Sequence, residues 1–402
     1  MPLILLALAL TSLAIWLYVA TGRSMFWRLS EYDDDLAKHQ PPIAWPSVIA
    51  VVPARNESAT IRQALTSLLS QDYPGEFSIV VVDDHSEDAT AQIAGQAARD
   101  LNAESRIEIH AAARLSPGWT GKLWALNEGV THAAARPSPR SATNEQPEPT
   151  YYWFTDADIV HAPDTLQRLV ARAEHDHIDL TSLMVLLQAK TLPERTLIPA
   201  FLFFFLKLYP PRWIASPRAR TAGAAGGCIL LRSKSLQQIG GLAAIRSEVI
   251  DDCALARAVK QKGGHLWMGL TRASISLRAY TTFAEMRDMI ARTAFTQLRY
   301  NPLLLLGTLA GMFFTYLAPI ALLFAPNPAP RILAACTWLL MSLLYLPTIR
   351  FYRQSPAWAL SLPFTALFYS YATLLSAARC YLGRGAQWKG RSQATRRNGK
   401  RG

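Results

Sequence analysis

Long apolar stretches occupy both ends of the chain, and shorter apolar runs alternate with amphipathic segments between them. Residues 2–20 carry no charge and are long enough for a membrane helix, which needs about 20 residues. Three more apolar blocks lie toward the carboxyl end, at 303–325, 332–348 and 356–381. The long segment between has the mixed composition of a soluble domain. This pattern predicts a soluble domain held between membrane anchors.

Basic residues set the expected orientation of the first span. Arg23 and Arg28 follow it, whereas nothing basic precedes it. A signal peptide would have a basic start, a shorter apolar core and a small-residue cleavage site. The positive-inside rule therefore predicts that the amino terminus lies outside and the next segment lies in the cytoplasm. We expect a multi-pass protein of the inner (plasma) membrane.

The last residues conflict with a simple count of spans. Four spans would return the tail to the outside, yet residues 383–402 carry seven Lys or Arg and no acid. Either one carboxyl-terminal block is re-entrant, with 356–381 and its internal Pro363 the candidate, or the positive-inside rule fails here.

Strand-like and helix-like segments alternate in the middle of the chain. Apolar, β-branched runs are followed by segments with helical periodicity, and a polar Pro/Ser-rich insertion at 136–150 is expected to be a surface loop. Alternating strands and helices predict an α/β domain, with a mostly parallel sheet and helices on both faces. Ligands of such sheets bind beyond the carboxyl ends of the strands. The expected strands cover 47–54, 77–86, 106–112 and 151–160.

Four carboxylates stand at such strand ends: Asp83, Asp84, Asp156 and Asp158. In an extended segment, residues i and i+2 point to the same side, so Asp156 and Asp158 can face one ligand. Hard oxygen donors suit Mg²⁺ or Mn²⁺. The alternative is a turn in which both side chains cap backbone amides. Asp83 and Asp84 could bond a ribose or base, or belong to a helix cap.

A polar cluster follows the first strand. The cluster consists of Pro53, Arg55, Asn56 and Glu57. It could bind a nucleotide, or it could only form the turn that begins the next helix. Lys122 opens a later helix after two glycines, where a phosphate would be favoured. The segment is not a Walker A loop, because Leu123 stands where Ser or Thr is needed. A solvated lysine is the alternative.

Two further segments could act on a substrate. Asp251 and Asp252 stand before a helix that ends at Gly263–Gly264, so one could be an N-cap and the other a general base. Gln297 and Arg299 lie just before the first carboxyl-terminal span. They could contact lipid headgroups or close over a diphosphate.

Charge and cysteine content narrow the function classes. The net charge of +12 permits nucleic-acid binding, but the excess lies near the membrane ends. We therefore expect no nucleic-acid partner and a tail on anionic lipid. The four cysteines form no Cys-x-x-Cys pair, so zinc and redox motifs are unsupported.

The six segments described above lie within residues 47–302. In their order along the chain, they resemble the family 2 inverting glycosyltransferases with a GT-A fold. The run 156–158 is similar to the metal-binding Asp-x-Asp of the family, with Asp158 as the implied direct ligand. The segment "VDDHS" resembles its Asp-Asp-Gly-Ser nucleotide motif, with His85 replacing glycine. The pair 251–252 resembles its acidic pair, in which the second acid, Asp252, is the base.

The segment "TQLRY" resembles the Gln-x-x-Arg-Trp signature of the family, with Thr296 and Tyr300 departing from it. The departure disfavours a polysaccharide synthase and favours a single transfer to a lipid. The layout is most similar to the hopanoid-biosynthesis-associated glycosyltransferases, and ceramide-type or polyprenyl-phosphate glycosyltransferases are more distant. The resemblance implies a nucleotide-sugar donor whose diphosphate binds Mg²⁺ or Mn²⁺. It also implies that Arg299 and Lys122 stabilise the departing phosphate.

The chain is thus expected to be a membrane-bound enzyme with a cytoplasmic GT-A domain. Residues 197–209 are too short to span and are expected to form a buried or an interfacial helix beside the acceptor entrance. A transporter would need ionisable groups within its spans, and the apolar blocks contain almost none, so we expect anchors. An inactive scaffold is also disfavoured, because all the acids that the chemistry needs are present. The expected parts are an anchor at 1–22, the GT-A domain at 45–302 (donor half 45–160, acceptor half 161–302), spans at 303–381 and a basic tail at 382–402.

Overall fold

The computed structural model describes residues 2–33, 41–135, 150–383, 387–388 and 391–392. They form two compact units. The sheet unit comprises Glu31–Leu187, Trp213–Ala279 and Gln387–Gly402, and the apolar unit comprises Met1–Ser30, Gln188–Arg212 and Tyr280–Ala386. Most of the expected insertion at 136–150 and most of the basic tail at 382–402 lie outside the described residues.

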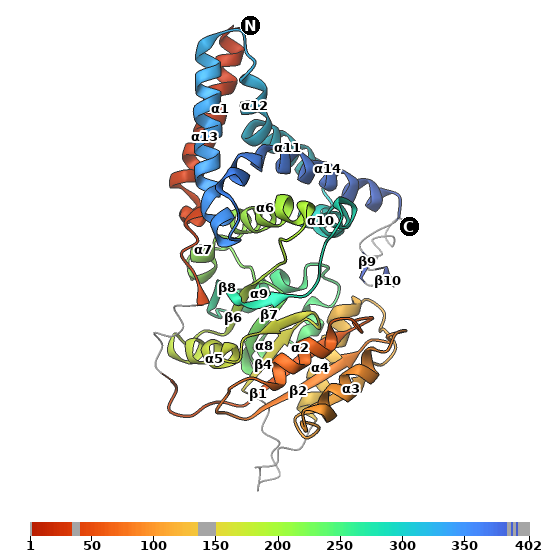
Figure 1. The fold of residues 1–402 in the computed structure, drawn as a ribbon. Helices are drawn as coiled ribbons and strands as arrows, with labels where there is room; N and C mark the ends of the chain where they lie inside the picture. The colour runs from red at the N-terminus through yellow and green to blue at the C-terminus, as the bar shows by residue number, and fades with distance from the viewer. Residues whose placement is uncertain (1, 34–40, 136–149, 384–386, 389–390, 393–402) are drawn as a thin grey trace, which may run out of the picture. The chain divides into compact units, whose positions relative to one another are not determined.

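The sheet unit is built on a mixed sheet that has eight strands among the described residues, in the order β3-β2-β1-β4-β7-β6-β8-β5 (Figure 1). The amino-terminal half is parallel, because β1 pairs in parallel with β2 and β4, and β2 pairs in parallel with β3. β7 is antiparallel to both neighbours, and β5 is antiparallel to β8. The strands are β1 (Val48–Ala54), β2 (Phe77–Asp83), β3 (Ile107–Ala111), β4 (Tyr151–Thr155), β5 (Ile159–His161), β6 (Leu180–Leu186), β7 (Cys228–Arg232) and β8 (Leu266–Ser276).

Helices cover both faces of this sheet, which confirms the predicted α/β class. Alternate residues of β1 face opposite ways. Val52 packs in the buried cluster that includes Leu65 of α2, whereas Val51 faces α4 at Gly129. The helices are α2 (Ile61–Leu69), α3 (Thr90–Asp100), α4 (Gly121–Ala134), α5 (Thr165–His175), α8 (Ser233–Gln238), η3 (Leu242–Ile245) and α9 (Asp251–Gln261), and α7 (Pro211–Ala215) lies at the boundary of the units.

The predicted strand at 151–160 is two strands separated by a turn. β4 ends at Thr155 and pairs with β1 and β7, whereas β5 begins at Ile159 and pairs with β8. The chain must turn at 156–158 to change partners, and the amide of Ile159 donates to the carbonyl of Asp156 (3.2 Å). Because the two acids lie on a turn, the alternation argument for their common direction is wrong.

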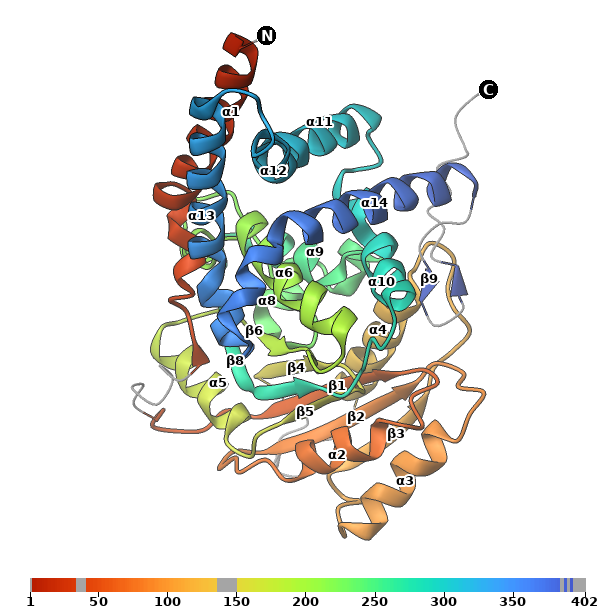
Figure 2. The same ribbon diagram turned by 45° about the horizontal axis from the view of Figure 1, so that its top comes forward.

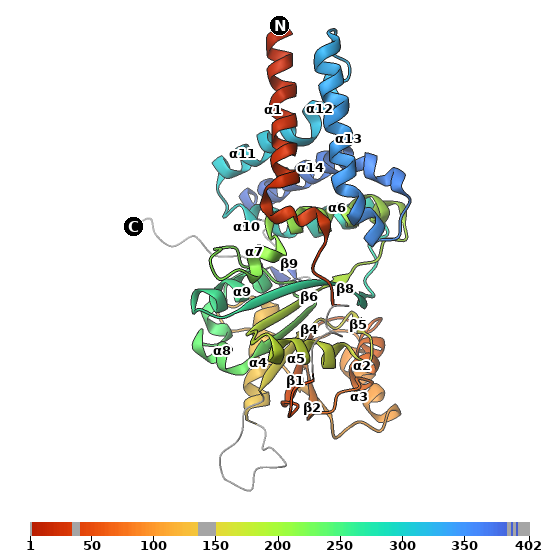
Figure 3. The same cartoon turned by 90° about the vertical axis from the view of Figure 1, so that its left-hand side faces the viewer.

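The apolar unit is helical. α1 and α13 lie side by side, and α6 and α14 run across their direction (Figures 1 and 3). Figure 2 shows α10 beside α14. The elements are α1 (Pro2–Thr21), η1 (Arg23–Arg28), α6 (Leu192–Leu208), α10 (Phe283–Gln297), α11 (Pro302–Met312), the π-helical turn η4 (Phe313–Leu317), α12 (Ala318–Leu322), α13 (Pro328–Phe351), η5 (Pro356–Ser361) and α14 (Leu362–Tyr381), and the short strands β9 (Gln387–Trp388) and β10 (Arg391–Ser392) pair with each other.

Five helical segments of the described chain are long and apolar enough to cross a membrane. They are Pro2–Thr21, Leu192–Ala215, Pro302–Leu322, Pro328–Phe351 and Pro356–Tyr381. The second was predicted to be too short at 197–209. It begins earlier because Thr191 and Glu194 form a capping box, in which each side chain accepts a hydrogen bond from the other residue's amide.

Candidate active site

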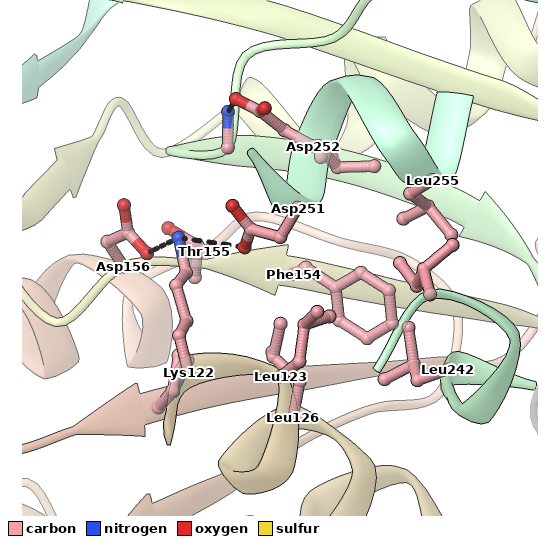
Figure 4. Close-up of a pocket in the computed structure, with 14 residues that line it drawn as sticks. Lys122, Leu123, Leu126, Phe154, Thr155, Asp156, Leu242, Asp251, Asp252 and Leu255 are labelled. Atoms are coloured by element: carbon pink, nitrogen blue, oxygen red, sulfur yellow. Dashed lines mark hydrogen bonds and ion pairs between the residues drawn. The ribbon is translucent and has the colours of Figure 1, made fainter. Parts of the chain in front are cut away.

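The candidate site is a pocket of the sheet unit at the carboxyl ends of the central strands. Its polar lining comes from the start of α4, the end of β4 and the start of α9, as Figure 4 shows. Apolar side chains line the rest. The charged members are Lys122, Asp156, Asp251 and Asp252, and the apolar members include Leu123, Leu126, Phe154, Leu242 and Leu255.

Lys122 is the cation between these acids. Its Nζ lies 2.7 Å from Oδ1 of Asp156 and 3.6 Å from Oδ2 of Asp251 (Figure 4). Burial by itself lowers the pKa of Lys122, but Asp156, Asp251 and Asp252 together raise it above its ordinary value. The ammonium group therefore stays charged and offsets the carboxylates. The structure brings together Lys122 and both acidic motifs, which the sequence had suggested separately.

Asp252 is held by two backbone amides. Gly226 donates to Oδ2 (2.9 Å) and Cys253 donates to Oδ1 (2.7 Å). The N-cap position of α9 belongs to Ile250, so neither acid is the cap. Burial and the neighbouring Asp251 raise the pKa of Asp252 to about 6, against the opposing effects of Lys122 and the two amides. A carboxylate of that pKa can accept a proton near neutral pH.

A glycine leaves room for this arrangement. A Cβ at Gly226 would lie 3.3 Å from Oδ2 of Asp252 and 3.4 Å from Nζ of Lys122. Any larger residue would crowd both polar groups. Gly226 belongs to the run "GAAGG", whose glycines predict either a close approach of the backbone to sugar or acceptor, or only a flexible turn.

Asp158 is 9% exposed and faces negative neighbours. Burial, Asp156 and Glu57 raise its pKa to about 6, and Arg278 and Lys122 oppose the rise. A buried carboxylate with a second carboxylate beside it favours an added cation.

The donor set fits a hard divalent cation with further ligands from outside the protein. Within the described residues, no group of three or more His, Cys, Asp or Glu is arranged to hold a metal ion. Mg²⁺ is usually bound by one or two carboxylates and completed by substrate phosphates and water. The two aspartates of the turn therefore supply what such a cation takes from a protein.

The cluster after β1 fastens two strand ends together. The guanidinium of Arg55 donates to the carbonyls of Asp84 (2.5 Å) and His85 (3.0 Å). The amide of Asn56 donates to Ser86 Oγ (3.0 Å), and its side chain accepts from the amide of Glu87 (2.8 Å). Arg55 and Asn56, predicted to touch a nucleotide, thus shape the turn that follows β2.

Asp83 and His85 mark the place where a ligand could bind this turn. Oδ1 of Asp83 is buried and, among the described residues, has no hydrogen-bond partner. A buried oxygen of this kind is expected to receive a donor from elsewhere. His85 has φ +52°, a region that glycine adopts more easily. This backbone conformation explains why the Asp-Asp-Gly-Ser motif that the segment resembles has glycine at the position of His85. Pro53 lines the pocket, and Glu57 faces Asp158.

The remaining predicted residues lie in the apolar unit. Gln297 is the last residue of α10. Its Nε2 and Oε1 atoms lie 2.7 Å and 3.0 Å from the hydroxyl oxygen of Tyr209. Arg299 follows with φ +53° and Tyr300 with φ +56°. Thr296 donates to the hydroxyl of Tyr300 (3.0 Å). Their roles toward the acids of the sheet unit stay a prediction.

Comparisons with known proteins support the same fold. Residues 49–240 match the family described as Glycosyl transferase family 2. The chain is 31% identical over 132 residues to the poly(ribitol-phosphate) beta-N-acetylglucosaminyltransferase TarS of Staphylococcus aureus (strain MW2), a match that covers 32% of this chain and 19% of that protein. An N-acetylglucosaminyltransferase of Mesorhizobium japonicum is 27% identical over 131 residues, covering 32% of this chain and 26% of that protein.

These curated relatives are thus matched over about a fifth to a quarter of their own length. A solved structure covers more. The mannosyltransferase PcManGT of Pyrobaculum calidifontis, in complex with GDP-Man and Mn²⁺, aligns with a TM-score of 0.51 at 20% identity, over 94% of this chain and 99% of that one. Residues 49–240 are thus similar to the glycosyltransferase family 2 domain, and the chain shares with the mannosyltransferase structure a GT-A-like fold, a mixed sheet with flanking helices.

Proposed function

We propose that the protein is a membrane-bound glycosyltransferase that moves a sugar from a nucleotide-sugar to a lipid hydroxyl with inversion. The observation that carries this proposal is the pocket in which Lys122 separates Asp156 from the acid pair 251–252. The part of the pocket that holds Lys122 and Asp156 lies within residues 49–240, which match the family 2 model. The five long apolar helices support attachment to a membrane, which we take to be the inner (plasma) membrane.

The donor binds at the strand ends in this proposal. The nucleoside occupies the turns after β1 and β2, where the unpaired Oδ1 of Asp83 accepts a donor from the base or ribose. Asp156 and Asp158 hold Mg²⁺ or Mn²⁺, which when bound supplies Lewis-acid neutralisation of the diphosphate. Lys122 lies beside Asp156 and adds a fixed positive charge for the departing phosphate. The Mn²⁺ and GDP-Man bound to PcManGT are consistent with this assignment.

Asp252 is the proposed base. It takes the proton of the acceptor hydroxyl while that oxygen attacks the anomeric carbon from the side opposite the diphosphate. The bond from the anomeric carbon to the phosphate oxygen breaks in the same step, so the configuration inverts. Two amides fix the carboxylate, and its raised pKa brings its basicity close to neutral pH. Asp251 orients Lys122. The family resemblance implies a further role for Arg299 and Gln297 at the diphosphate.

The acceptor is proposed to be a membrane lipid of the hopanoid type. The long apolar helices favour an acceptor that resides in a membrane, and the chain's layout resembles glycosyltransferases of hopanoid biosynthesis. Ceramide-type and polyprenyl-phosphate acceptors are the alternatives. The matched relatives are N-acetylglucosaminyltransferases, so UDP-N-acetylglucosamine belongs in the donor panel beside GDP-mannose and UDP-glucose.

The test uses the purified full chain in lipid nanodiscs with Mn²⁺, a panel of nucleotide-sugars and a lipid extract. We expect release of nucleoside diphosphate together with a glycosylated lipid whose anomeric configuration is inverted relative to the donor. Asp252→Asn should remove turnover while donor binding, measured by calorimetry, stays within about twofold. The exposed Asp164→Asn is the matched control and should behave like wild type. Turnover retained by Asp252→Asn would refute the base assignment, and a transporter or scaffold would release no nucleotide from any donor.

A further inference from the structure

α14 has the length of a membrane span but not the direction of one. It belongs to a 26-residue helical segment apolar enough to cross a bilayer. Within the apolar unit, however, it runs across the direction of α1 and α13 in Figures 1 and 3. Length and composition alone do not decide whether α14 spans the bilayer or lies along its surface. The faces of the helix and the elements that it contacts decide between these placements.

The two faces of α14 differ sharply. One face is buried in the apolar unit and includes Ala366, Tyr369, Ala372, Ser376 and Ala377. The opposite face is an exposed apolar stripe at helical spacing, formed by Phe364, Leu367, Tyr371, Leu374 and Tyr381, whose exposure ranges from 47% to 67%. A continuous apolar stripe of this kind needs a nonpolar neighbour.

Polar contacts bind the buried face to α10. The amide of Phe295 donates to Oγ of Ser376 (3.0 Å), and Arg379 pairs with Asp288 (2.7 Å). On α6, the carbonyl of Leu197 accepts from the hydroxyl of Tyr369 (2.9 Å). α14 is therefore fixed to its neighbours near the middle and toward its carboxyl end.

α10 cannot lie in hydrocarbon. Its sequence carries Glu285, Arg287, Asp288 and Arg292 within two turns. Each ionised side chain at the bilayer centre costs about 2.5–3.5 kcal/mol on insertion scales. α10 therefore belongs at the water interface, and α14, which packs on it, belongs at the same depth.

The segment of α6 does not cross, because it connects β6 and β7, which pair with each other in one sheet. The remaining long helices account for the crossings. Early in α1, Ala9 packs with Leu322 at the end of α12 and with Ala334 near the start of α13. Later in α1, Trp16 Nε1 donates to the carbonyl of Thr315 (2.7 Å). The segment from η4 to α12 therefore runs opposite to α1, and Figure 3 shows α13 beside α1 and running in the same direction. After α13, the chain is back at the end of α1 from which it enters the sheet unit.

We propose that α14 lies in the membrane interface with its stripe against the acyl chains, and that the chain crosses the bilayer three times. The crossings are α1, the segment from α11 to α12, and α13. The tail then emerges on the side of the sheet unit. The basic residues agree, because Arg23 and Arg28 follow α1, Arg350 lies in the last turn of α13, and Arg353 follows α13. The inference rests on the membrane attachment in the proposed function.

Depth measurements along the stripe test the proposal. Nitroxide labels at cysteines replacing Phe364, Tyr371 and Ala378, each seven residues apart, are measured by power saturation with the full chain in lipid vesicles. The background carries Cys336→Ser and Cys380→Ser, since the other two cysteines are buried. An interfacial helix gives equal depths within a few ångströms. A spanning helix gives a middle label about 10 Å deeper than a label seven residues away.

α13 supplies the matched control. Labels at its exposed Ile332 and Leu339 should differ in depth by about 10 Å. If they do not, the membrane attachment itself is refuted. If they do and the α14 labels are also graded, only the interfacial placement is overturned.

The side of the tail is read separately. A cysteine replacing Ser392 is labelled with a membrane-impermeant maleimide in intact spheroplasts and in inverted vesicles, beside a reference cysteine replacing the exposed Glu104 of the sheet unit. Both should react from the same side. Reaction of Ser392→Cys from the opposite side would restore four crossings and overturn the proposal.

Discussion

Replacing His161 should change how the stability of the sheet unit depends on pH. The side chain is 3% exposed and packs against Trp153, with ring centroids 4.7 Å apart and the rings tilted by 55°. Nε2 lies 2.8 Å from Oγ1 of Thr155, and Nδ1 lies 2.8 Å from Oγ of Ser274. Thr155 in turn donates to the carbonyl of Gly227 (3.0 Å). The neutral Nε2–H tautomer satisfies every group in this chain, with Ser274 as donor to Nδ1.

The magnitude follows from the pKa. Burial lowers the pKa of His161 to about 3, whereas an unfolded histidine titrates near 6.5. The unfolded state therefore binds the proton first as the pH falls. Stability from this residue is complete above about pH 6.5 and is lost on the way down to about 3. The loss is about 1.4 kcal/mol per pH unit, or about 2 kcal/mol at pH 5.

Two carboxyl groups act in the opposite direction. The pKa values of Asp158 and Asp252 are raised to about 6, so their protonation favours the folded state as the pH falls below that value. The absolute pH dependence of the wild type is therefore mixed. The difference between the wild type and a variant at His161 isolates the histidine.

The assay is equilibrium urea unfolding of the full chain in detergent, followed by tryptophan fluorescence at pH 8, 6.5 and 5. His161→Gln keeps an amide able to bond Thr155 and cannot be protonated. Relative to wild type, it should gain about 2 kcal/mol between pH 8 and pH 5. His161→Leu should show the same gain but be destabilised throughout by about 2–4 kcal/mol, because buried hydroxyls lose their partner. Parallel curves for the wild type and His161→Gln would refute the reasoning.

Other predictions concern the pocket and one helix. If Asp252 is the base, kcat/KM should fall about tenfold per pH unit below about 6, and a flat profile from pH 5 to 7 would contradict this. Lys122→Met removes the counter-ion of the neighbouring carboxylates and should lower kcat by about 100-fold in the donor assay, with Lys122→Arg retaining more activity. Gly129→Ala would place a Cβ 2.4 Å from a methyl of Val51. It should destabilise the fold by about 1–3 kcal/mol despite better helix propensity, whereas Gly95→Ala, with no atom nearer than 3.6 Å, should be neutral or stabilising in the same unfolding assay.

Local sequence patterns determined the broad plan of the molecule. The β-branched runs predicted β1 and β2 closely, since a strand buried on both faces needs continuous apolar residues, and the prediction also located the part-exposed edge strand β3. Acids that follow such runs had to lie at the ligand-binding edge of a parallel sheet. The uncharged terminal stretches likewise required long apolar helices. Each of these features depends on residues within one or two elements.

Tertiary structure decided what depends on distant partners. The break between β4 and β5 arises because β5 pairs with β8, which lies more than 100 residues later in the chain. No local sequence pattern indicates such a distant pairing. The partnership of Lys122 with Asp156 and Asp251 depends on three segments meeting at one sheet edge. The burial of His161 and the direction of α14 depend on packing in the same way. Sequence periodicity specifies which face of an element is apolar, but the element that covers this face is chosen by the whole fold.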